Sequence, residues 1–229
     1  LTKIITGILT NKNKMISIII PVLNEETGIV RLLDYLKNNS SFTNNEIIVV
    51  DGGSTDKTPE LVKEYSGVSF ISSEKGRAKQ MNTGAKNATF DVLYFLHADS
   101  FPPPNFDQSI LDQINSGNKA GCFQMKFDMD HWWLNLMGWF TKFNHKACRG
   151  GDQSLFITKS LFKELGGYNE TFVVYEDNEF IGRLYKQNRF EVIPQLITTS
   201  ASTYEKIGVW KLHYCVWAIY VKRLNGDSR

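Results

Sequence analysis

The stretch that decides the fold is Ile16-Ser17-Ile18-Ile19-Ile20-Pro21-Val22, followed by Leu23-Asn24-Glu25-Glu26. Its first seven residues form a β-branched run closed by a proline, which is typical of a strand buried on both faces of a parallel sheet. A polar and acidic segment follows at the carboxyl end of this strand. Ligands of open parallel sheets bind outside that end, so the search for a functional site also begins there.

Strand and helix patterns alternate beyond this first strand. Further strands are predicted at residues 46–51, 68–72 and 91–96, and helices at 29–36, from 58 onward, at 77–88 and at 105–115. The second half is less regular, with strands predicted at 120–127 and 154–158 and helices at 131–143, 159–165 and 177–187. This order predicts an α/β fold with an open, mostly parallel sheet and helices on both faces.

The composition limits the function classes. The chain has 229 residues, enough for one domain with a decorated end at roughly 150 residues per domain. Its 26 Lys and Arg against 24 Asp and Glu leave a net charge of +2, too small for the broad basic field of a nucleic-acid-binding protein. Three widely spaced cysteines fit neither a disulfide framework nor a Cys-x-x-Cys zinc site, so a reducing, cytoplasmic compartment is expected.

Acidic residues follow three of the predicted strands. The three segments are Asn24-Glu25-Glu26, Asp51-Gly52-Gly53-Ser54-Thr55-Asp56 and His97-Ala98-Asp99. Such clusters at one sheet edge are costly unless a cation neutralises them, and Mg²⁺ or Mn²⁺ carrying a phosphorylated ligand suits carboxylate oxygens. Neither Gly-x-Gly-x-x-Gly nor Gly-x-x-x-x-Gly-Lys occurs, which argues against a dinucleotide dehydrogenase or a P-loop enzyme. Arg77 and Lys75 are then candidate partners for phosphate charge.

These motifs resemble those of family 2 glycosyltransferases with the GT-A fold. The resemblance rests on residues 18–26 and 49–56 and on Glu176-Asp177 with Glu179, and it extends over about residues 15–202. Three further motifs, at residues 76–82, 97–99 and 151–153, are similar to those of the radical-SAM or selenodomain-associated glycosyltransferases, a small bacterial subgroup. The resemblance implies a nucleotide-diphospho-sugar transferase that moves a sugar from a nucleoside-diphosphate sugar, expected to be a UDP-sugar, to an acceptor hydroxyl.

The resemblance also implies where the donor would bind. The implied nucleotide-sugar residues are Pro21, Asn24, Glu25, Asp51, Arg77, Ala98 and Asp99. Asp51 would accept a hydrogen bond from the base, and Arg77 would lie beside the nucleotide. Asp99 matches the last acid of the Asp-x-Asp motif and would bind Mn²⁺ or Mg²⁺. His97 stands where the first acid of that motif would be, so a neutral donor replaces a carboxylate and His97 is a second candidate metal ligand.

Catalysis is assigned by the resemblance to Asp177. This residue matches the general base that takes the proton from the acceptor hydroxyl in a single, inverting displacement. Candidates for contacts with the acceptor or the donor sugar are Trp139, Asp152, Gln153 and Glu176. On the predicted helix at 177–187, Glu179 is expected to pair with Arg183 at i, i+4.

The two ends of the chain are predicted to be separate from the main domain, residues 15–206. Residues 1–14 precede Met15 and are interpreted as an N-terminal extension outside the core. Residues 207–229 are expected to form an apolar, amphipathic helix and tail whose segment 209–221 is too short to span a bilayer. Two interpretations are open for this helix: peripheral contact with the inner face of the cell membrane, near a lipid-linked acceptor, or packing against the domain or a second subunit of a homo-oligomer.

Structural alternatives accompany these assignments. Asp51 and Asp56 are also suited to capping the tight turn, and Asp152 and Gln153 to ordering the glycine turn before them. The aromatic cluster at residues 132–143 is expected to pack in the core, the alternative being a lip on which an acceptor sugar or lipid stacks. For the whole protein, the competing hypotheses are a catalytically inactive nucleotide-sugar-binding or scaffold protein and a sugar-phosphate nucleotidyltransferase, whose Gly-rich, basic first loop is absent.

Overall fold

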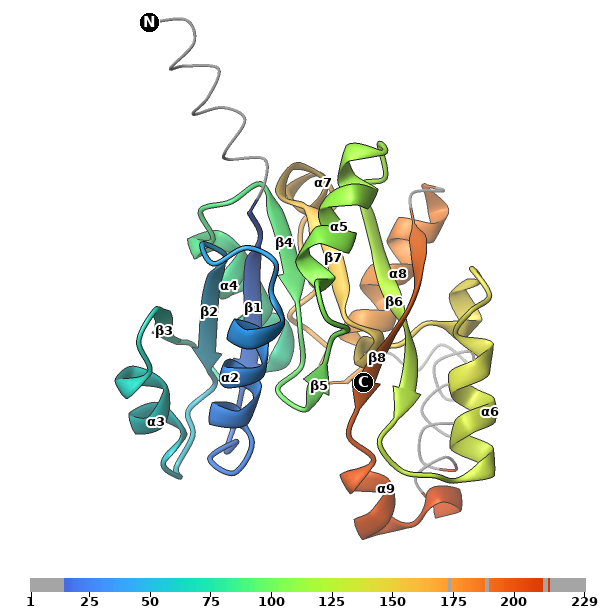
Figure 1. The fold of residues 1–229 in the computed structure, drawn as a ribbon, viewed down its shortest axis with the longest axis horizontal. Coiled ribbons are helices and arrows are strands. Elements are labelled where there is room, and N and C mark those ends of the chain that lie inside the picture. The colour runs from blue at the N-terminus through green and yellow to red at the C-terminus, as the bar shows by residue number, and fades with distance from the viewer. Residues whose placement is uncertain (1–14, 173, 188–189, 212–213, 215–229) are drawn as a thin grey trace, which may run out of the picture.

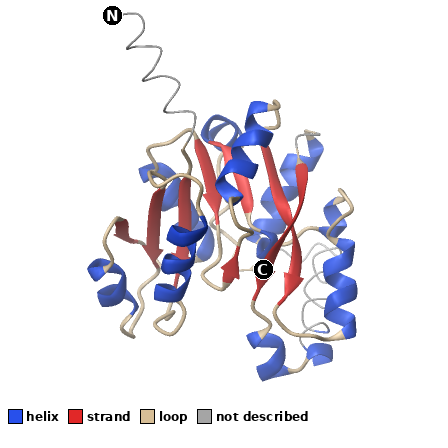
Figure 2. Ribbon diagram, in the orientation of Figure 1, coloured by secondary structure: helices blue, strands red, loops and turns tan. Residues whose placement is uncertain are grey.

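The structure, a computed structural model, describes residues 15–172, 174–187, 190–211 and 214 of the chain. An eight-stranded sheet in the order β3-β2-β1-β4-β7-β6-β8-β5 forms its centre, and helices cover both faces (Figure 1; Figure 2). The predicted α/β class, with a mostly parallel sheet between helices, is confirmed.

The first half of the sheet follows the predicted alternation. Its elements are β1 (Ser17–Val22), α2 (Ile29–Asn39), β2 (Glu46–Asp51), α3 (Thr58–Glu64), β3 (Val68–Ser72), α4 (Arg77–Asn87) and β4 (Val92–Phe95). Strand β1 pairs in parallel with both β2 and β4, and β3 pairs in parallel with β2. The carboxyl ends of these four strands therefore point to one edge of the sheet.

The second half of the sheet is mixed. Its elements are β5 (Ser100–Phe101), α5 (Phe106–Asn115), β6 (Ala120–Phe127), α6 (Trp132–Phe140), the 3₁₀ turns η1 (Lys146–Cys148) and η2 (Gly151–Gln153), β7 (Leu155–Thr158), α7 (Lys159–Glu164), α8 (Glu176–Lys186), β8 (Glu191–Thr199) and α9 (Ser202–Ile207). Strand β7 is antiparallel to both of its neighbours, β4 and β6, whereas β8 is parallel to β6.

Two hydrophobic cores lie on opposite faces of the sheet. Along β1, Ile18 and Ile20 belong to the core under α2, α3 and α5, and Ile19 belongs to the core under α4, α7 and α8. Both sets are fully buried, which is why this strand is a continuous apolar run rather than an alternating one. Gly84 lets α4 approach β1 closely, because a Cβ at this position would overlap Cγ2 of Ile19.

Strand β8 was not predicted from the sequence, and its proline explains why. Pro194 interrupts the apolar pattern, and prolines are normally confined to edges and bulges of sheets. The register between β6 and β8 shifts at this point: Phe123 lies opposite Ile193, and Gln124 lies opposite Leu196. Pro194 and Gln195 are accommodated in this irregularity, so the strand continues on either side of them. The two-residue β5 and the short α9 were also not predicted.

The prediction that the aromatic cluster at residues 132–143 packs in the core was wrong. Trp132 is 63% exposed and Trp139 is 50% exposed, and Phe140 and Phe143 are exposed as well. Helix α6 lies beside β6 at one side of the sheet (Figure 1), and only Leu134 and Gly138 of this helix are buried. With so narrow a buried stripe, most of the aromatic side chains remain on the surface.

The predicted segments at the two ends of the chain are only partly visible. Ile207 ends α9, and residues 209–211 and 214 are helical. The predicted extension at residues 1–14 and the remainder of the predicted segment 207–229 lie outside the described residues. In the described part of the chain, no helix combines the length and the apolar character needed to cross a membrane.

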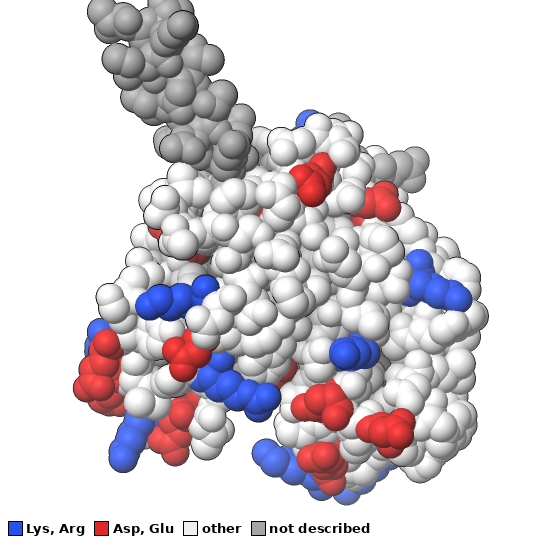
Figure 3. Space-filling view, in the orientation of Figure 1, with Lys and Arg blue, Asp and Glu red and all other residues white. Residues whose placement is uncertain are grey.

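Charges of both signs are interspersed on the face seen in Figure 3. Blue and red side chains adjoin at the lower left, red ones are grouped at the lower right, and much of the centre is white (Figure 3). This distribution accords with the net charge of +2 and gives this face no broad basic field.

Candidate active site

Four segments that are distant in sequence bring charged side chains together beyond the end of β4. Arg77 is the first residue of α4, His97 follows β4, Asp152 lies in η2, and Glu176 and Asp177 begin α8. The start of α4, the end of β4 and the start of α8 all lie at the carboxyl edge of the sheet. The sequence predicts the site at this edge. Of the residues expected to gather at this edge, His97 and Asp177 meet here, and Arg77, Asp152 and Glu176 join them.

His97 lies between two carboxylates. Its Nδ1 is 3.5 Å from Oδ1 of Asp152, and its Nε2 is 3.5 Å from Oδ2 of Asp177. Burial by itself would lower the pKa of His97, but the contacts with Asp152 and Asp177 raise that pKa to about 9. The two carboxylates therefore favour the protonated imidazole over the neutral form expected at this position. Both ring nitrogens lie 3.5 Å from carboxylates, and the role of His97 as a metal ligand stays a prediction.

Arg77 is the second cation of this cluster. Its Nη1 lies 3.2 Å from Oε1 of Glu176 and 3.7 Å from Oδ2 of Asp177. Oδ2 of Asp177 therefore faces both Arg77 and His97, while the side chain is only 11% exposed. Glu176 is buried, and burial followed by the charge of Asp177 raises its pKa. The pair at the start of α8 is thus held by two cations from other segments.

Gly151 makes the approach of these residues possible. A Cβ at this position would overlap Oδ2 of Asp177 and would lie 2.9 Å from Cε1 of His97. Only the absence of a side chain lets η2 pass so close to the start of α8. The neighbouring Gly150 has no atom within 4 Å of the place where its Cβ would be, so the close packing is specific to Gly151.

The cluster continues toward two further carboxylates, Glu25 and Asp99. Burial, and after it the charge of Asp99, raises the pKa of Glu25. Burial also raises the pKa of Asp99. His97 lowers this pKa, and the negative charge of Asp152 raises it further. The loops after β1 and β4 therefore bring acids within electrostatic range of one another, as predicted. Together with Asp152, Glu176 and Asp177, five carboxylates gather here, and the cations acting on them are Arg77, His97 and, at Glu25, Lys206.

A cleft lies beside this cluster, between the loop after β1 and the start of α4. Its volume is about 640 Å³. The lining residues are Pro21, Val22, Leu23, Glu25, Lys75, Gly76, Arg77, Ala78, Lys79, Gln80, Glu170 and Phe172. Three of the residues predicted to bind a nucleotide sugar, Pro21, Glu25 and Arg77, thus share one cleft, which we call the donor cleft. Ala98 is buried in the core next to this region.

Asp51 is placed differently from the other predicted acids. It is 5% exposed, and its carboxylate accepts hydrogen bonds from the backbone N–H groups of Gly53 and Ser54 and from the Ser54 hydroxyl. Asp51 is not among the residues that line the donor cleft. The structure therefore shows the turn-capping arrangement for Asp51, and the predicted contact with a base stays a prediction.

The turn after β2 is also tied to the loop after β1. Asn24 has a left-handed backbone (φ 58°), and its Oδ1 accepts a hydrogen bond from the Thr55 N–H at 2.8 Å. The Ser54 hydroxyl accepts one from the Asn24 N–H, also at 2.8 Å. Asp56 accepts hydrogen bonds from the N–H groups of Glu26 and Thr58, which confirms its capping role. Asn24 therefore connects the two loops, with its exposed side chain engaged by the protein itself.

Two residues of α4 that shape the site were missed from the sequence. The amide of the buried Gln80 donates hydrogen bonds to the carbonyls of Val22 and Val50, at 2.7 and 2.8 Å. Asn82 bonds both the N–H and the carbonyl of Tyr168, and its Nδ2 also reaches Oε1 of Glu170. Their place within the motif at 76–82 was the available signal. Residues of this motif contact different parts of the molecule: Gln80 contacts the strands, Asn82 the segment at Tyr168, and Arg77 the charged cluster. Their positions therefore follow no simple helical periodicity in the sequence.

The remaining predicted residues of this region are not equally close to the cluster. Gln153 is buried and exchanges hydrogen bonds with Arg149 and the Cys148 carbonyl, which is the ordering role considered for it. Arg149 itself was not predicted; it is buried and also donates to the carbonyls of residues 141 and 143.

The ring contacts of Trp139 within the described residues are with Phe140, Phe143 and the Lys142 ammonium. The predicted i, i+4 pair of Glu179 and Arg183 is confirmed at 2.9 Å.

The donor set for a divalent cation is small. In the part of the chain that the structure describes, no group of three or more His, Cys, Asp or Glu side chains is arranged to hold a metal ion. Asp99 keeps part of its surface open to solvent although other segments surround its carboxylate, which accepts one side-chain hydrogen bond, from the Ser100 hydroxyl at 3.4 Å. Magnesium sites in enzymes often use one or two carboxylates together with substrate phosphates. A single carboxylate at Asp99 fits a cation that arrives with a diphosphate.

Comparison with known proteins places this arrangement in context. Residues 17–169 match the family described as Glycosyl transferase family 2. A dolichol-phosphate mannosyltransferase of Pyrococcus furiosus is 33% identical over 108 residues, which is 45% of this chain and 31% of that protein. The chain thus spans about a third of the length of this curated relative.

Solved structures share the fold. The crystal structure of S. aureus TarS 1-349 in complex with UDP-GlcNAc aligns with a TM-score of 0.65 and 19% identity, over 81% of this chain and 58% of that one. A mannosyltransferase from Pyrobaculum calidifontis in complex with GDP-Man and Mn²⁺ aligns with a TM-score of 0.64 and 18% identity, over 80% of this chain and 56% of that one. At these identities the likeness concerns the fold.

Proposed function

This chain belongs to glycosyl transferase family 2, and from that premise we propose that it transfers a sugar from a nucleoside-diphosphate sugar to an acceptor hydroxyl with inversion at the anomeric carbon. The observation that carries the proposal is the position of Asp177, whose Oδ2 faces Arg77 and His97 next to the donor cleft. The motifs at residues 76–82, 97–99 and 151–153 support membership of the radical-SAM or selenodomain-associated subgroup.

The donor cleft would hold the nucleotide sugar. Arg77 offers a guanidinium that lines the cleft and reaches the carboxylates at the start of α8, so it connects donor binding to the reacting end. Lys75 and Lys79 line the same cleft and suit a diphosphate. A UDP-sugar is the proposed donor, and the TarS structure supports this choice because that protein binds UDP-GlcNAc.

Asp177 would act as the general base. As the acceptor hydroxyl oxygen bonds to the anomeric carbon, its proton passes to Asp177, and the bond to the diphosphate breaks with its electron pair staying on the leaving group. The contacts of Oδ2 with Arg77 and His97 orient the carboxylate, and Gly151 keeps the space beside it free of a side chain. Asp152 positions His97 from the opposite ring nitrogen.

Asp99 would hold Mn²⁺ or Mg²⁺ together with the donor diphosphate. Its access to solvent and the carboxylates of Glu25 and Asp152 within electrostatic range support a site that gains from a cation. Such a cation would supply positive charge to the diphosphate as it leaves. The relative from Pyrobaculum calidifontis, solved with GDP-Man and Mn²⁺, is in line with this proposal.

Lipid contact is a further part of the proposal. The name of the Pyrococcus furiosus relative includes dolichol phosphate, which supports a lipid-linked acceptor for this chain. Trp132 of α6 and Trp210 are both exposed, and their ring centroids lie 6.1 Å apart, so the region near residue 207 presents aromatic surface suited to a membrane interface. Equal sedimentation of wild type and a Trp132→Ala/Trp210→Ala variant with anionic vesicles would contradict this contact.

The decisive test is the Asp177→Asn substitution. A thermal-shift panel of nucleotide sugars with and without Mn²⁺ first identifies the donor by selective stabilisation. We then expect turnover to fall by at least about a hundredfold, the scale of a general base, with donor affinity nearly unchanged.

The matched control is Asp91→Asn, an exposed aspartate away from the cluster, which should leave turnover unchanged. Wild-type turnover in Asp177→Asn would refute the assignment of the base. Donor binding without any turnover in the wild type would instead favour the hypothesis of a nucleotide-sugar-binding protein.

A further inference from the structure

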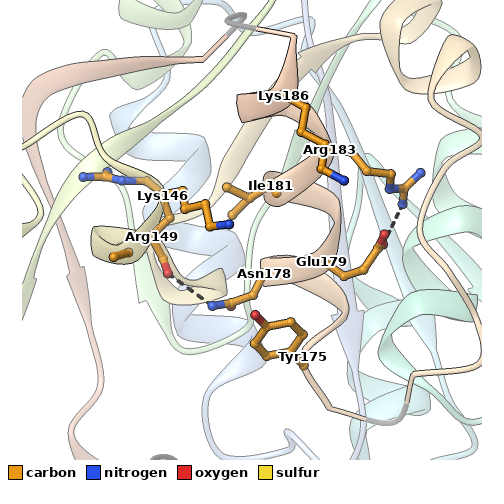
Figure 4. A pocket seen from close by; sticks show the side chains of 10 residues that line it. Lys146, Arg149, Tyr175, Asn178, Glu179, Ile181, Arg183 and Lys186 are labelled. Carbon is orange, nitrogen blue, oxygen red and sulfur yellow. Dashed lines mark hydrogen bonds and ion pairs between the residues drawn. The ribbon is translucent and has the colours of Figure 1, made fainter. Parts of the chain in front are cut away.

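A second groove lies along α8, and none of its lining residues is shared with the donor cleft. It is enclosed by η1 and one side of α8 and has a volume of about 650 Å³ (Figure 4). Its lining residues are Lys146, Ala147, Arg149, Tyr175, Asn178, Glu179, Ile181, Gly182, Arg183 and Lys186. Tyr175 and Asn178 flank Glu176 and Asp177 in sequence, so this α8 groove begins next to the proposed base.

The α8 groove carries an excess of positive charge. Lys146 and Lys186 are exposed, and neither forms an ion pair with a carboxylate of the described residues. The only acid in the lining, Glu179, is neutralised by Arg183 at 2.9 Å. In Figure 4, Lys146 extends from η1 toward α8, and Lys186 lies on α8 itself. Two ammonium groups are therefore available to a ligand that enters between these walls.

Gly182 is an independent sign that this space is kept open. It lies in the interior of α8, where glycine is less favourable than alanine because it orders a freer backbone. No packing requires it, since no atom lies within 4 Å of the place where its Cβ would be, and its φ is not positive. Neither a turn nor a close contact requires this glycine. Because it lies on the wall of a basic groove, its missing side chain leaves room for a ligand.

The backbone before Asp177 is also unusual on this side. Tyr175 precedes α8 with a φ of 86°, a left-handed conformation that is strained for a bulky residue. Asn178 is fixed from the opposite wall by a 3.4 Å hydrogen bond to the Arg149 carbonyl. The entrance of the α8 groove is thus built by residues whose conformation also sets the direction in which α8 begins.

We propose that the α8 groove binds a phosphate ester of the acceptor at Lys146 and Lys186 and thereby presents the acceptor hydroxyl to Asp177. This inference rests on the proposed function and names the acceptor class for the same site. Lys186 lies nine positions after Asp177, which is about 13.5 Å along the helix axis at 1.5 Å per residue. At that separation the phosphate anchors the acceptor, and a hydroxyl elsewhere on the molecule is the group that reacts.

The test is a titration of the full chain with inorganic phosphate, followed through the backbone amide resonances of Tyr175, Asn178 and Gly182. These amides should shift saturably in the wild type. In Lys146→Ala/Lys186→Ala the affinity should fall at least about tenfold, because two charge-assisted contacts are lost. Gly182→Leu should have a similar effect by filling the groove.

The matched control is Lys86→Ala/Lys163→Ala, which removes two lysines from a different pocket, near α4 and α7. It should bind phosphate at these amides as the wild type does. The absence of a saturable shift in the wild type, or unchanged affinity in Lys146→Ala/Lys186→Ala, would overturn the proposal.

Two further arms identify the source of the phosphate. Saturable shifts with a hexose 6-phosphate but not with phosphatidylglycerol vesicles assign the α8 groove to a soluble phosphate ester, and the opposite pattern assigns it to a lipid headgroup. The proposed function is judged separately, by turnover in Asp177→Asn. Loss of turnover there with no phosphate binding in the α8 groove would reject this inference alone.

Discussion

The turn after β2 and the charged cluster at the start of α8 lie at the same edge of the sheet, but their polar groups are used in opposite ways. Around Asp51, carboxylate, hydroxyl and N–H groups satisfy one another, and little is left for a ligand. Around Asp177, carboxylates outnumber cations, and several of them have raised pKa values. The first arrangement stabilises the fold; the second leaves charge available for chemistry.

The contrast between the charged cluster and the turn after β2 is tested most directly by a substitution at Gly151. In Gly151→Ala, the new methyl group would displace Asp177 and His97, and we expect turnover to fall about a hundredfold, or about 2.7 kcal/mol of transition-state stabilisation. Steady-state kinetics with the identified donor measure this. Gly150→Ala, where the added Cβ meets nothing, is the control and should keep wild-type turnover. Equal rates in the two variants would mean that the packing at Gly151 does not position the base.

A second test removes the carboxylate of Asp99. With Mn²⁺ and UDP at about a hundred times their Kd, the wild type should gain on the order of 2.7 kcal/mol of stability, and Asp99→Asn should lose most of the Mn²⁺-dependent part. Thermal shift with and without chelator measures it. Without ligands, Asp99→Asn should melt at or slightly above the wild-type temperature, because a carboxylate with a raised pKa is removed from beside Asp152. An unchanged response to Mn²⁺ would exclude Asp99 as the ligand.

The turn after β2 should respond in stability instead. Asp51→Ala leaves the N–H groups of Gly53 and Ser54 without their acceptor, and we expect the free energy of unfolding to drop by about 2 kcal/mol. Urea denaturation measures the loss. Asp56 is half-buried, whereas Asp51 is buried, so Asp56→Ala should cost less. A larger loss of stability in Asp177→Asn than in Asp51→Ala would reverse the comparison.

The smallest effect is expected at Gly182, and it has the opposite sign. Gly182→Ala should stabilise the protein by roughly 0.5–1 kcal/mol, because alanine is the better helix former and its methyl group meets no neighbour. Melting temperature reports this gain. A destabilised Gly182→Ala variant would show that packing, rather than an open groove, requires the glycine.

The first half of the fold was predictable because its signals are local. Strand β1 is buried on both faces, and each following helix covers a neighbouring strand, so apolar runs and helical spacing reveal the order of the elements. Strand β8 was not predictable in this way, since its continuity past Pro194 depends on the register shift opposite β6. The exposed aromatic face of α6 was mispredicted because aromatic content alone does not reveal which side of a helix has a neighbour.

The candidate site was predicted in part, for a similar reason. The strand-end rule pointed to Glu25, and the family resemblance pointed to Arg77 and Asp177; Glu25 and Arg77 line the donor cleft, and Arg77 contacts Asp177. The raised pKa of His97 depends on carboxylates from η2 and α8, which no spacing in the sequence places beside it. Gln80 and Asn82 act through backbone groups of distant segments, and such partners have no signature of their own in the sequence.

The hydrogen bonds of Asn82 bear on how this scaffold can be re-engineered. These hydrogen bonds connect Tyr168 and Glu170 to α4, the helix that also supplies Arg77. One way to alter which nucleotide is accepted is to replace α4 with that of a homologue. This exchange would remove the hydrogen bonds of Asn82 and misalign the segment that leads into α8. A working chimera must therefore transplant α4 and residues 168–170 as one cassette.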